Sequence, residues 1–250
     1  MILRTVLLCL LVLLLAPTAV AVGPTGAVVL YAYHLKPPFI TDLERRQGLY
    51  FDFADYANRK LGRTALWLEY EPRRRLERTV FSPGFDGAVI GVSPIWFKDK
   101  DEILFLWTPS LMHDRDEVVS RRRQPVDYTG PRSVDGKIFG AATGYYYFGI
   151  DELVKKGKIR REDTVSEQQN LRKLLLGRLD FAIVSRSTLD YLMRQPGQAN
   201  RFHISPKPHD DYDRRILIAL SRPELLAELK PLMEAMPSDP EWQAILARYR

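Results

Sequence analysis

Two stretches of the chain repeat the same pattern of apolar and polar positions. Asp86-Gly87-Ala88-Val89-Ile90 follows an apolar-periodic run that stops at Gly84, and Asp180-Phe181-Ala182-Ile183-Val184 follows a similar run that stops at Gly177. In each place the spacing predicts a helix that ends at glycine, and the continuous apolar run predicts a strand buried on both faces. The two stretches therefore predict two similar α/β lobes.

The rest of the chain continues this alternation of strands and helices. Capping boxes predict that helices begin after Ser166, Ser221 and Ser238, and Ser187 is expected to cap a short helix that starts at Thr188. Strands are predicted over 28–33, 65–70, 117–120, 137–141 and 215–220, and further helices over 52–61, from Pro72, and over 145–156. The chain then crosses between lobes near 118–124 and 212–216. This assigns 22–118 with 216–250 to lobe 1 and 119–215 to lobe 2.

The N-terminus has the pattern of a secretory signal peptide. Arg4 precedes an apolar region from Val6 to Leu15, and Ala19-Val20-Ala21 is an A-x-A cleavage site. Cleavage after Ala21 is expected, so residues 1–21 would be removed. Cys9, the only cysteine, lies in this segment, so the mature chain would have no disulfide and no cysteine-based metal site. No other apolar run is long enough to span a bilayer, which predicts a soluble mature chain.

The charge of the chain favours anionic partners without identifying one. The net charge is +6 and the sequence pI is about 9.4. Arginine runs such as 121–123 are typical of solvated surfaces, and no basic stripe interleaved with aromatics indicates nucleic-acid binding. The spacing of His203, His209, Asp210 and Asp211 fits no metal-ligand set, so no metal or other cofactor is expected.

Polar and aromatic side chains gather where the predicted strands end, which is where ligands bind in open α/β sheets. A predicted strand–glycine turn–helix at 141–145 would also offer free N–H groups to an anion, although many such turns bind nothing. Alternatively, the aromatic residues are packing elements of loops. The candidate ligand-binding residues are Tyr33, His34, Phe39, Ser93, Trp96, Thr143, Gly144, Tyr145, Ser185 and Arg186.

These pieces, in this order after a signal peptide, resemble type II periplasmic solute-binding proteins of bacterial extracellular solute-binding protein family 3. The resemblance covers nearly all of the mature chain. It rests on Tyr33…Pro38-Phe39, Gly48…Asp52, Gly84/Asp86, Asp135-Gly136-Lys137…Gly140…Gly144, Gly177-Arg178-Leu179-Asp180 and Trp242…Ile245…Tyr249.

The resemblance implies a monomeric periplasmic protein whose two lobes, joined by two hinge strands, close on a small solute and deliver it to an inner-membrane ABC permease or a sensor. Amino-acid binders of this kind usually place an Arg shortly after the Ser93 position and a carboxylate after the second Asp strand. Here Trp96-Phe97-Lys98 and Ser185-Arg186 stand instead. The expected solute is therefore small and polar or anionic, and an aromatic compound bound by Arg186, Lys98 and the tyrosines at 145–147 is also consistent.

Two other functions compete with solute binding. A periplasmic enzyme on a related fold would need a placed acid or base. Only His34 and Asp52 qualify, and no catalytic motif accompanies them, so the chain is predicted not to be an enzyme. An accessory domain that docks a protein partner or the envelope through its basic surface is the stronger alternative.

Overall fold

The computed structural model describes residues 25–63, 65–197 and 200–249. The predicted signal peptide and its cleavage site lie outside these residues. Within the described residues, no helix is both long and apolar enough to cross a membrane.

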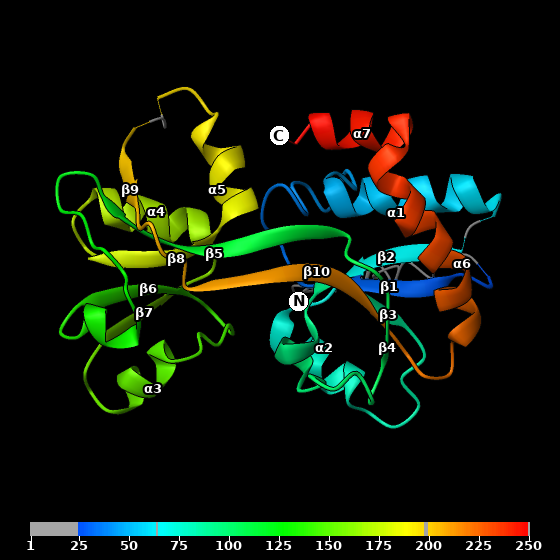
Figure 1. Ribbon diagram of the computed structural model, residues 1–250, viewed down its shortest axis with the longest axis horizontal. Helices are drawn as coiled ribbons and strands as arrows, with labels where there is room; N and C mark the ends of the chain where they lie inside the picture. The colour runs from blue at the N-terminus through cyan, green and yellow to red at the C-terminus, as the bar shows by residue number, and fades with distance from the viewer. Residues whose placement is uncertain (1–24, 64, 198–199, 250) are drawn as a thin grey trace, which may run out of the picture.

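The chain forms two α/β lobes side by side, and two long strands run between them (Figure 1). The sheet order is β2-β1-β3-β10-β5-β8-β6-β7, with β4 paired to β10 and β9 paired to β5. In lobe 1 the strands are β1 (Val28–Ala32), β2 (Leu66–Tyr70), β3 (Ala88–Val92) and β4 (Leu106–Trp107). In lobe 2 they are β6 (Ile138–Ala142), β7 (Arg160–Thr164), β8 (Phe181–Ser185) and β9 (Phe202–Ile204).

The connecting strands are β5 (Met112–Arg121) and β10 (Asp210–Ile218), as the two-hinge prediction requires. Antiparallel pairing joins β10 to β5 from Asp210 to Arg214 and to β3 from Arg215 to Ile218. β5 continues into lobe 2, where Asp116 to Ser120 pair with β8. The lobe boundaries predicted at 118/119 and 215/216 thus fall inside the two crossing strands.

Helices cover both faces of the sheet in each lobe. Lobe 1 carries α1 (Leu49–Leu61), α6 (Pro223–Ala235), η3 (Met236–Ser238) and α7 (Pro240–Ala247) on one face, and α2 (Arg73–Val80) and η1 (Pro94–Phe97) on the other. Lobe 2 carries η2 (Pro131–Val134) and α3 (Ile150–Lys155) on one face, and α4 (Glu167–Leu175) and α5 (Arg186–Met193) on the other.

The repeated strand pattern is confirmed as two strands buried on both faces. In β8, Phe181 and Ile183 pack into one core cluster, whereas Ala182 and Val184 pack into the opposite one. In β3, Ala88 and Ile90 likewise face one cluster and Val89 faces the other. Successive side chains of a strand alternate between faces, so a continuous apolar run needs a cover on both sides.

Three of the four predicted serine caps are wrong. Ser166 does cap α4, since its side chain accepts from Gln169 N at 3.2 Å. By contrast, α7 is capped by Asp239, whose carboxylate accepts from Glu241 N and Trp242 N, and not by Ser238. The remaining two begin at Pro223, after Arg222, and at Arg186, after Ser185. A proline fits the first helical turn because it has no N–H to satisfy, so Pro223 and Pro240 mark the true starts.

Candidate functional site

Aromatic side chains from both lobes meet where the lobes face each other. The ring centroids of Tyr33 and His34 are 3.9 Å apart, and Tyr145 of lobe 2 lies 5.7 Å from Tyr33 and 6.5 Å from His34. Phe39 and Trp96 flank His34 at 5.5 and 6.4 Å. We call these five residues the aromatic cluster. Five of the ten candidate residues therefore converge, as expected for side chains at the ends of neighbouring strands.

Local structure positions each member of the cluster. β1 ends at Ala32, and the prolines at 37 and 38 fix the following loop, which turns Phe39 inward until it is fully buried. After β3, Pro94 starts the 3-10 turn η1, which carries Trp96. Gly144, at φ +84°, reverses the chain after β6 and places Tyr145 against lobe 1.

A buried ionic contact crosses the cleft beside the cluster. Lys36, only 7% exposed, extends from lobe 1, and its ammonium donates to Glu167 Oε1 and to Ser185 Oγ at 2.9 Å. The same nitrogen lies 5.7 Å from the Tyr145 ring centroid and 5.8 Å from that of Phe39. Glu167 Oε2 accepts from Ser185 N at 3.3 Å, so both carboxylate oxygens are engaged. Burial raises the pKa of Glu167, although Lys36 acts in the opposite direction.

A second buried pair joins the two crossing strands. Arg214 of β10 donates from Nε to Asp114 Oδ2 of β5 at 2.7 Å, and each side chain is 1% exposed. Ser187 of lobe 2 also donates to Asp114, from Oγ at 2.7 Å and from N at 3.1 Å. Burial would raise the pKa of Asp114, but Arg214 and Ser187 outweigh that effect and lower it. The carboxylate thus connects the hinge to the first turn of α5.

His34 is held neutral in this environment. Arg214 Nη1 lies 3.1 Å from His34 Nε2, and the guanidinium can only donate, so Nε2 is an acceptor. Nδ1 lies 3.5 Å from the Tyr50 hydroxyl. Burial lowers the pKa of His34 well below its usual value, and Arg214, Lys36 and Arg73 lower it further. Both ring nitrogens therefore have partners within the protein.

The other candidates have different surroundings. Ser185 is fully buried and contacts Lys36, and Ser93 is buried at the start of η1. Thr143 is exposed and donates to Thr164 O at 3.0 Å. The predicted helix over 145–156 is wrong, because α3 spans only Ile150–Lys155. Thr143 and its neighbours therefore form a turn, and the expected helix N-terminus for an anion is not there.

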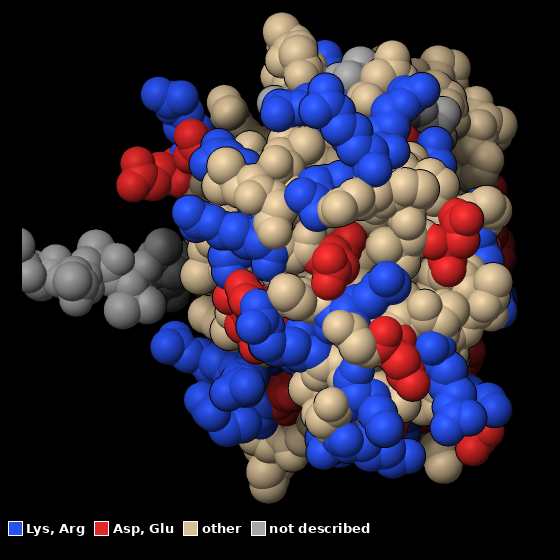
Figure 2. All heavy atoms as spheres, turned by 90° about the vertical axis from the view of Figure 1, so that its left-hand side faces the viewer, with Lys and Arg blue, Asp and Glu red and all other residues tan. Residues whose placement is uncertain are grey.

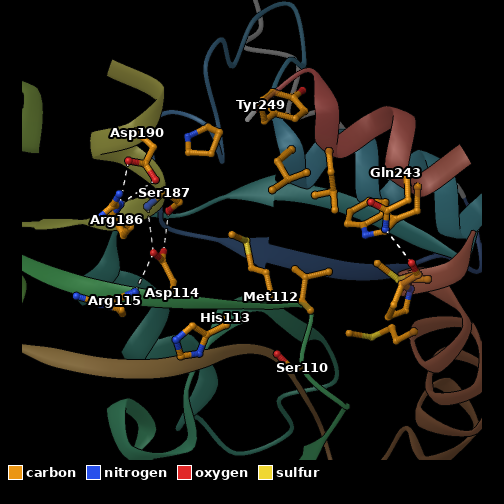
Figure 3. A pocket seen from close by; sticks show the side chains of 18 of the residues that line it. Ser110, Met112, His113, Asp114, Arg115, Arg186, Ser187, Asp190, Gln243 and Tyr249 are labelled. Atoms are coloured by element: carbon orange, nitrogen blue, oxygen red, sulfur yellow. Dashed lines mark hydrogen bonds and ion pairs between the residues drawn. The ribbon is translucent and has the colours of Figure 1, made fainter. Parts of the chain in front are cut away.

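Arg186 faces a separate cavity of about 820 Å³ between α5 and the C-terminal helices (Figure 3). Its Nε lies 2.9 Å from Asp190, and its Nη1 lies 3.6 Å from the buried Glu117. Asp114 and Ser187 line the same cavity and separate it from the buried Arg214. The apolar wall comes from both lobes and consists of Pro38, Leu49, Leu111, Met112, Met193, Ile204, Met233, Met236, Pro237, Trp242 and Leu246.

The sequence patterns did not single out four charged residues of this interface. Lys36 and Glu167 are 131 positions apart, and Asp114 and Arg214 are 100 apart. A signal was available for Arg214, which stands within the predicted crossing segment 212–216, but not for Asp114, which precedes the other predicted segment, 118–124. No group of three or more His, Cys, Asp or Glu suited to a metal ion occurs among the described residues.

Several solved structures share this fold. An ancestral arginine-binding protein bound to arginine superimposes with a TM-score of 0.66 and 16% identity, over 90% of this chain and 98% of that one. An arginine 3rd transport system periplasmic binding protein from Legionella pneumophila gives 0.64 and 13%, over 90% and 99%. A histidine kinase sensor domain with similarity to periplasmic binding proteins gives 0.69 and 17%, over 89% and 95%.

The chain therefore has the type II periplasmic-binding-protein fold, which confirms the fold implied by the sequence resemblance. No protein-family model matches the sequence, and no curated protein does so either. Identities of this size support the architecture and not a shared ligand.

Proposed function

We propose that this chain is a periplasmic solute-binding protein that closes its two lobes on a small polar solute at the aromatic cluster. The observation that carries this proposal is the convergence of Tyr33 and His34 from lobe 1 with Tyr145 and Ser185 from lobe 2 on one buried polar site. Aromatic faces with a few placed polar groups are typical of small-molecule sites.

The two crossing strands support a closing motion. β5 and β10 are the long strands that join the sheets of the two lobes, so bending near Asp114 and Arg214 would separate the lobes without disrupting either core. A solute that contacts both lobes favours the closed form, because it gains contacts there that the open form lacks. Export through the predicted signal peptide would place the monomer in the periplasm, where an ABC permease or a sensor would receive the solute.

A thermal-shift screen of the mature chain from Val22 tests the proposal. The library would contain amino acids, polyamines, organic acids, aromatic carboxylates and inorganic anions. A ligand present at a hundred times its dissociation constant adds about 2.7 kcal/mol to the free energy of unfolding. For a chain of this size that raises the melting temperature by about 5–11 °C.

Two neighbouring tyrosines provide a matched pair of variants. Tyr145 lies in the aromatic cluster, whereas Tyr146 is 59% exposed and hydrogen-bonds to Glu152 at 2.6 Å. A solute-induced shift that is lost in Tyr145→Ala and kept in Tyr146→Ala would support binding at the cluster. A saturable shift that persists in both variants would place the solute elsewhere.

An accessory domain that docks an anionic partner is the second candidate, and the distribution of charge favours it. Residues 121–209, within lobe 2, contain 17 Lys and Arg against 9 Asp and Glu, a net charge of +8, whereas the whole chain carries +6. Lys and Arg gather over the lobe 2 end of the molecule (Figure 2). There, a hollow of about 400 Å³ is lined by Arg121, Arg122, Arg123, Leu175, Asn200 and Arg201.

Binding of an acidic polymer separates the two candidates. Under the accessory function, polyglutamate binds in a salt-dependent manner, and Arg122→Glu with Arg123→Glu weakens binding while the solute screen gives no shift. The control is Arg74→Glu with Arg75→Glu, the same charge change at exposed positions of lobe 1. Equal weakening in both pairs would mean that only the net charge matters and would remove support for a docking face.

A further inference from the structure

The contacts of Lys36 describe a binding site for an ammonium group. The nitrogen has a carboxylate oxygen of Glu167 on one side, the hydroxyl of Ser185 at 2.9 Å on another, and the rings of Tyr145 and Phe39 within 6 Å. A carboxylate together with aromatic faces is the combination that proteins use to hold organic cations. Glu167, Ser185 and Tyr145 belong to lobe 2, and the cation comes from lobe 1.

Glu167 also supplies a group that the sequence did not place. A carboxylate was missing after the second Asp strand, where Ser185-Arg186 stands. In space, Glu167 from the first turn of α4 lies against Ser185, with its Oε2 3.3 Å from Ser185 N and 3.4 Å from Ser185 Oγ. A carboxylate from α4 therefore lies beside Ser185, at the end of β8, where the sequence itself has none.

A buried carboxylate of this kind needs a cation. Glu167 is 4% exposed, and removing the ammonium would leave its charge without a counterion in a site that excludes water. The loop that carries Lys36 is also tied to lobe 2, because Thr188 Oγ1 donates to Pro37 O at 2.6 Å. The lysine is therefore both a bridge between the lobes and the occupant of the site.

We infer that Glu167, Ser185 and Tyr145 form the ammonium subsite of the cleft, and that Lys36 is a tethered occupant which an amine-bearing solute replaces. This inference rests on the proposed solute-binding function for its physiological meaning, but the subsite itself can be tested separately. The solute class is then a small primary amine, and a purely anionic solute would instead depend on Lys36.

Chemical rescue tests the subsite. Lys36→Ala removes the tethered cation and leaves room for an alkylammonium ion, so propylammonium chloride should raise the melting temperature of this variant in a saturable manner. The wild type should show no such shift, since its own lysine fills the site. The double variant Lys36→Ala with Glu167→Gln should show none either, because the carboxylate charge is gone. Sodium chloride at equal concentration controls for ionic strength.

A second variant covers the case in which Lys36→Ala fails to fold. Lys36→Met keeps the apolar stem and vacates only the space of the ammonium group, so ammonium chloride is then the matching probe. The inference is overturned if folded Lys36→Met gains no stability from ammonium ions. It is also overturned if propylammonium shifts the wild type, or the double variant Lys36→Ala with Glu167→Gln, as much as it shifts Lys36→Ala.

Failure of the subsite and failure of solute binding give different results. If rescue fails while the library screen finds a solute lost in Tyr145→Ala, the cleft binds a solute through other groups. If rescue succeeds while the screen finds no solute, the ammonium site exists and the lysine acts as a permanent bridge. Support for both would come from a screened solute that carries a primary amine, binds more tightly to Lys36→Ala than to the wild type, and loses binding when its amine is acetylated.

Discussion

Arg214 should be among the most costly charged side chains to remove from this protein. Its guanidinium is 1% exposed, pairs with Asp114 at 2.7 Å and donates to Gly91 O at 3.0 Å. It also lies 4.4 Å from the Phe39 ring centroid. Arg214→Met keeps much of the side-chain volume but leaves Asp114 as a buried charge whose remaining partners, Ser187 and the backbone N–H of Arg115, carry no charge.

Breaking a buried ion pair by removing one partner costs about 3–5 kcal/mol. For a chain of this size, a loss of that order lowers the melting temperature by about 6–20 °C. The free energy of unfolding would be measured by urea titration, with thermal melting as a second measurement. The control is Arg63→Met, because Arg63 and Glu228 form a pair whose side chains are 49% and 35% exposed. That pair should contribute about 0–1 kcal/mol.

A double variant checks the mechanism. Combining Arg214→Met with Asp114→Asn removes both charges, so its cost should be lower than the sum of the two single costs by about 0.5–3 kcal/mol. The reasoning is refuted if Arg214→Met costs no more than Arg63→Met, or if the two changes in the buried pair are simply additive. Either result would mean that Asp114 is not a desolvated charge dependent on Arg214.

Two further outcomes follow from the same region. The pKa of His34 is lowered in the folded state, so below about pH 6.5 the unfolded chain binds more protons than the folded one, and stability is lost as the pH falls. Between pH 7 and 5.5 this loss amounts to about 1 kcal/mol, so urea titrations of His34→Gln should show a pH dependence smaller by that amount. Gly91→Ala should cost about 1–3 kcal/mol more free energy of unfolding than Gly62→Ala in the same assay. Both glycines have positive φ, but a Cβ at Gly91 would lie 1.7 Å from the Tyr50 hydroxyl oxygen, whereas one at Gly62 meets no atom within 4 Å. Equal costs would contradict the predicted clash.

Local patterns in the sequence were sufficient for the architecture. A continuous apolar run such as 181–184 can be satisfied only by a cover on each face, and β8 has both covers. Of the two segments predicted to change lobe, 212–216 lies within β10 and 118–124 overlaps the end of β5. The order of the predicted elements along the chain is enough to indicate two lobes. These features depend on neighbours a few residues away, and short-range periodicity records them directly.

Local patterns were less reliable where two signals overlapped. Ser238 and Asp239 are both good helix caps, and the proline at 240 decides in favour of Asp239 because it occupies the first helical position. Similarly, the predicted helix over 145–156 included the run of aromatic residues from Tyr145 to Phe148. Gly149, at φ +77°, interrupts that segment, and the helix begins only at Ile150.

The composition of the site was decided by the tertiary structure. Tyr33 and His34 could be selected from their position at a strand end, but no spacing connects Lys36 with Glu167 across 131 residues or Asp114 with Arg214 across 100. Such contacts depend on how one lobe is placed against the other, and that placement is set by the pairing of β5 with β10. Burial makes each of these charges costly without a partner, because a carboxylate or an ammonium excluded from water must be paired. The local sequence does not contain that partner.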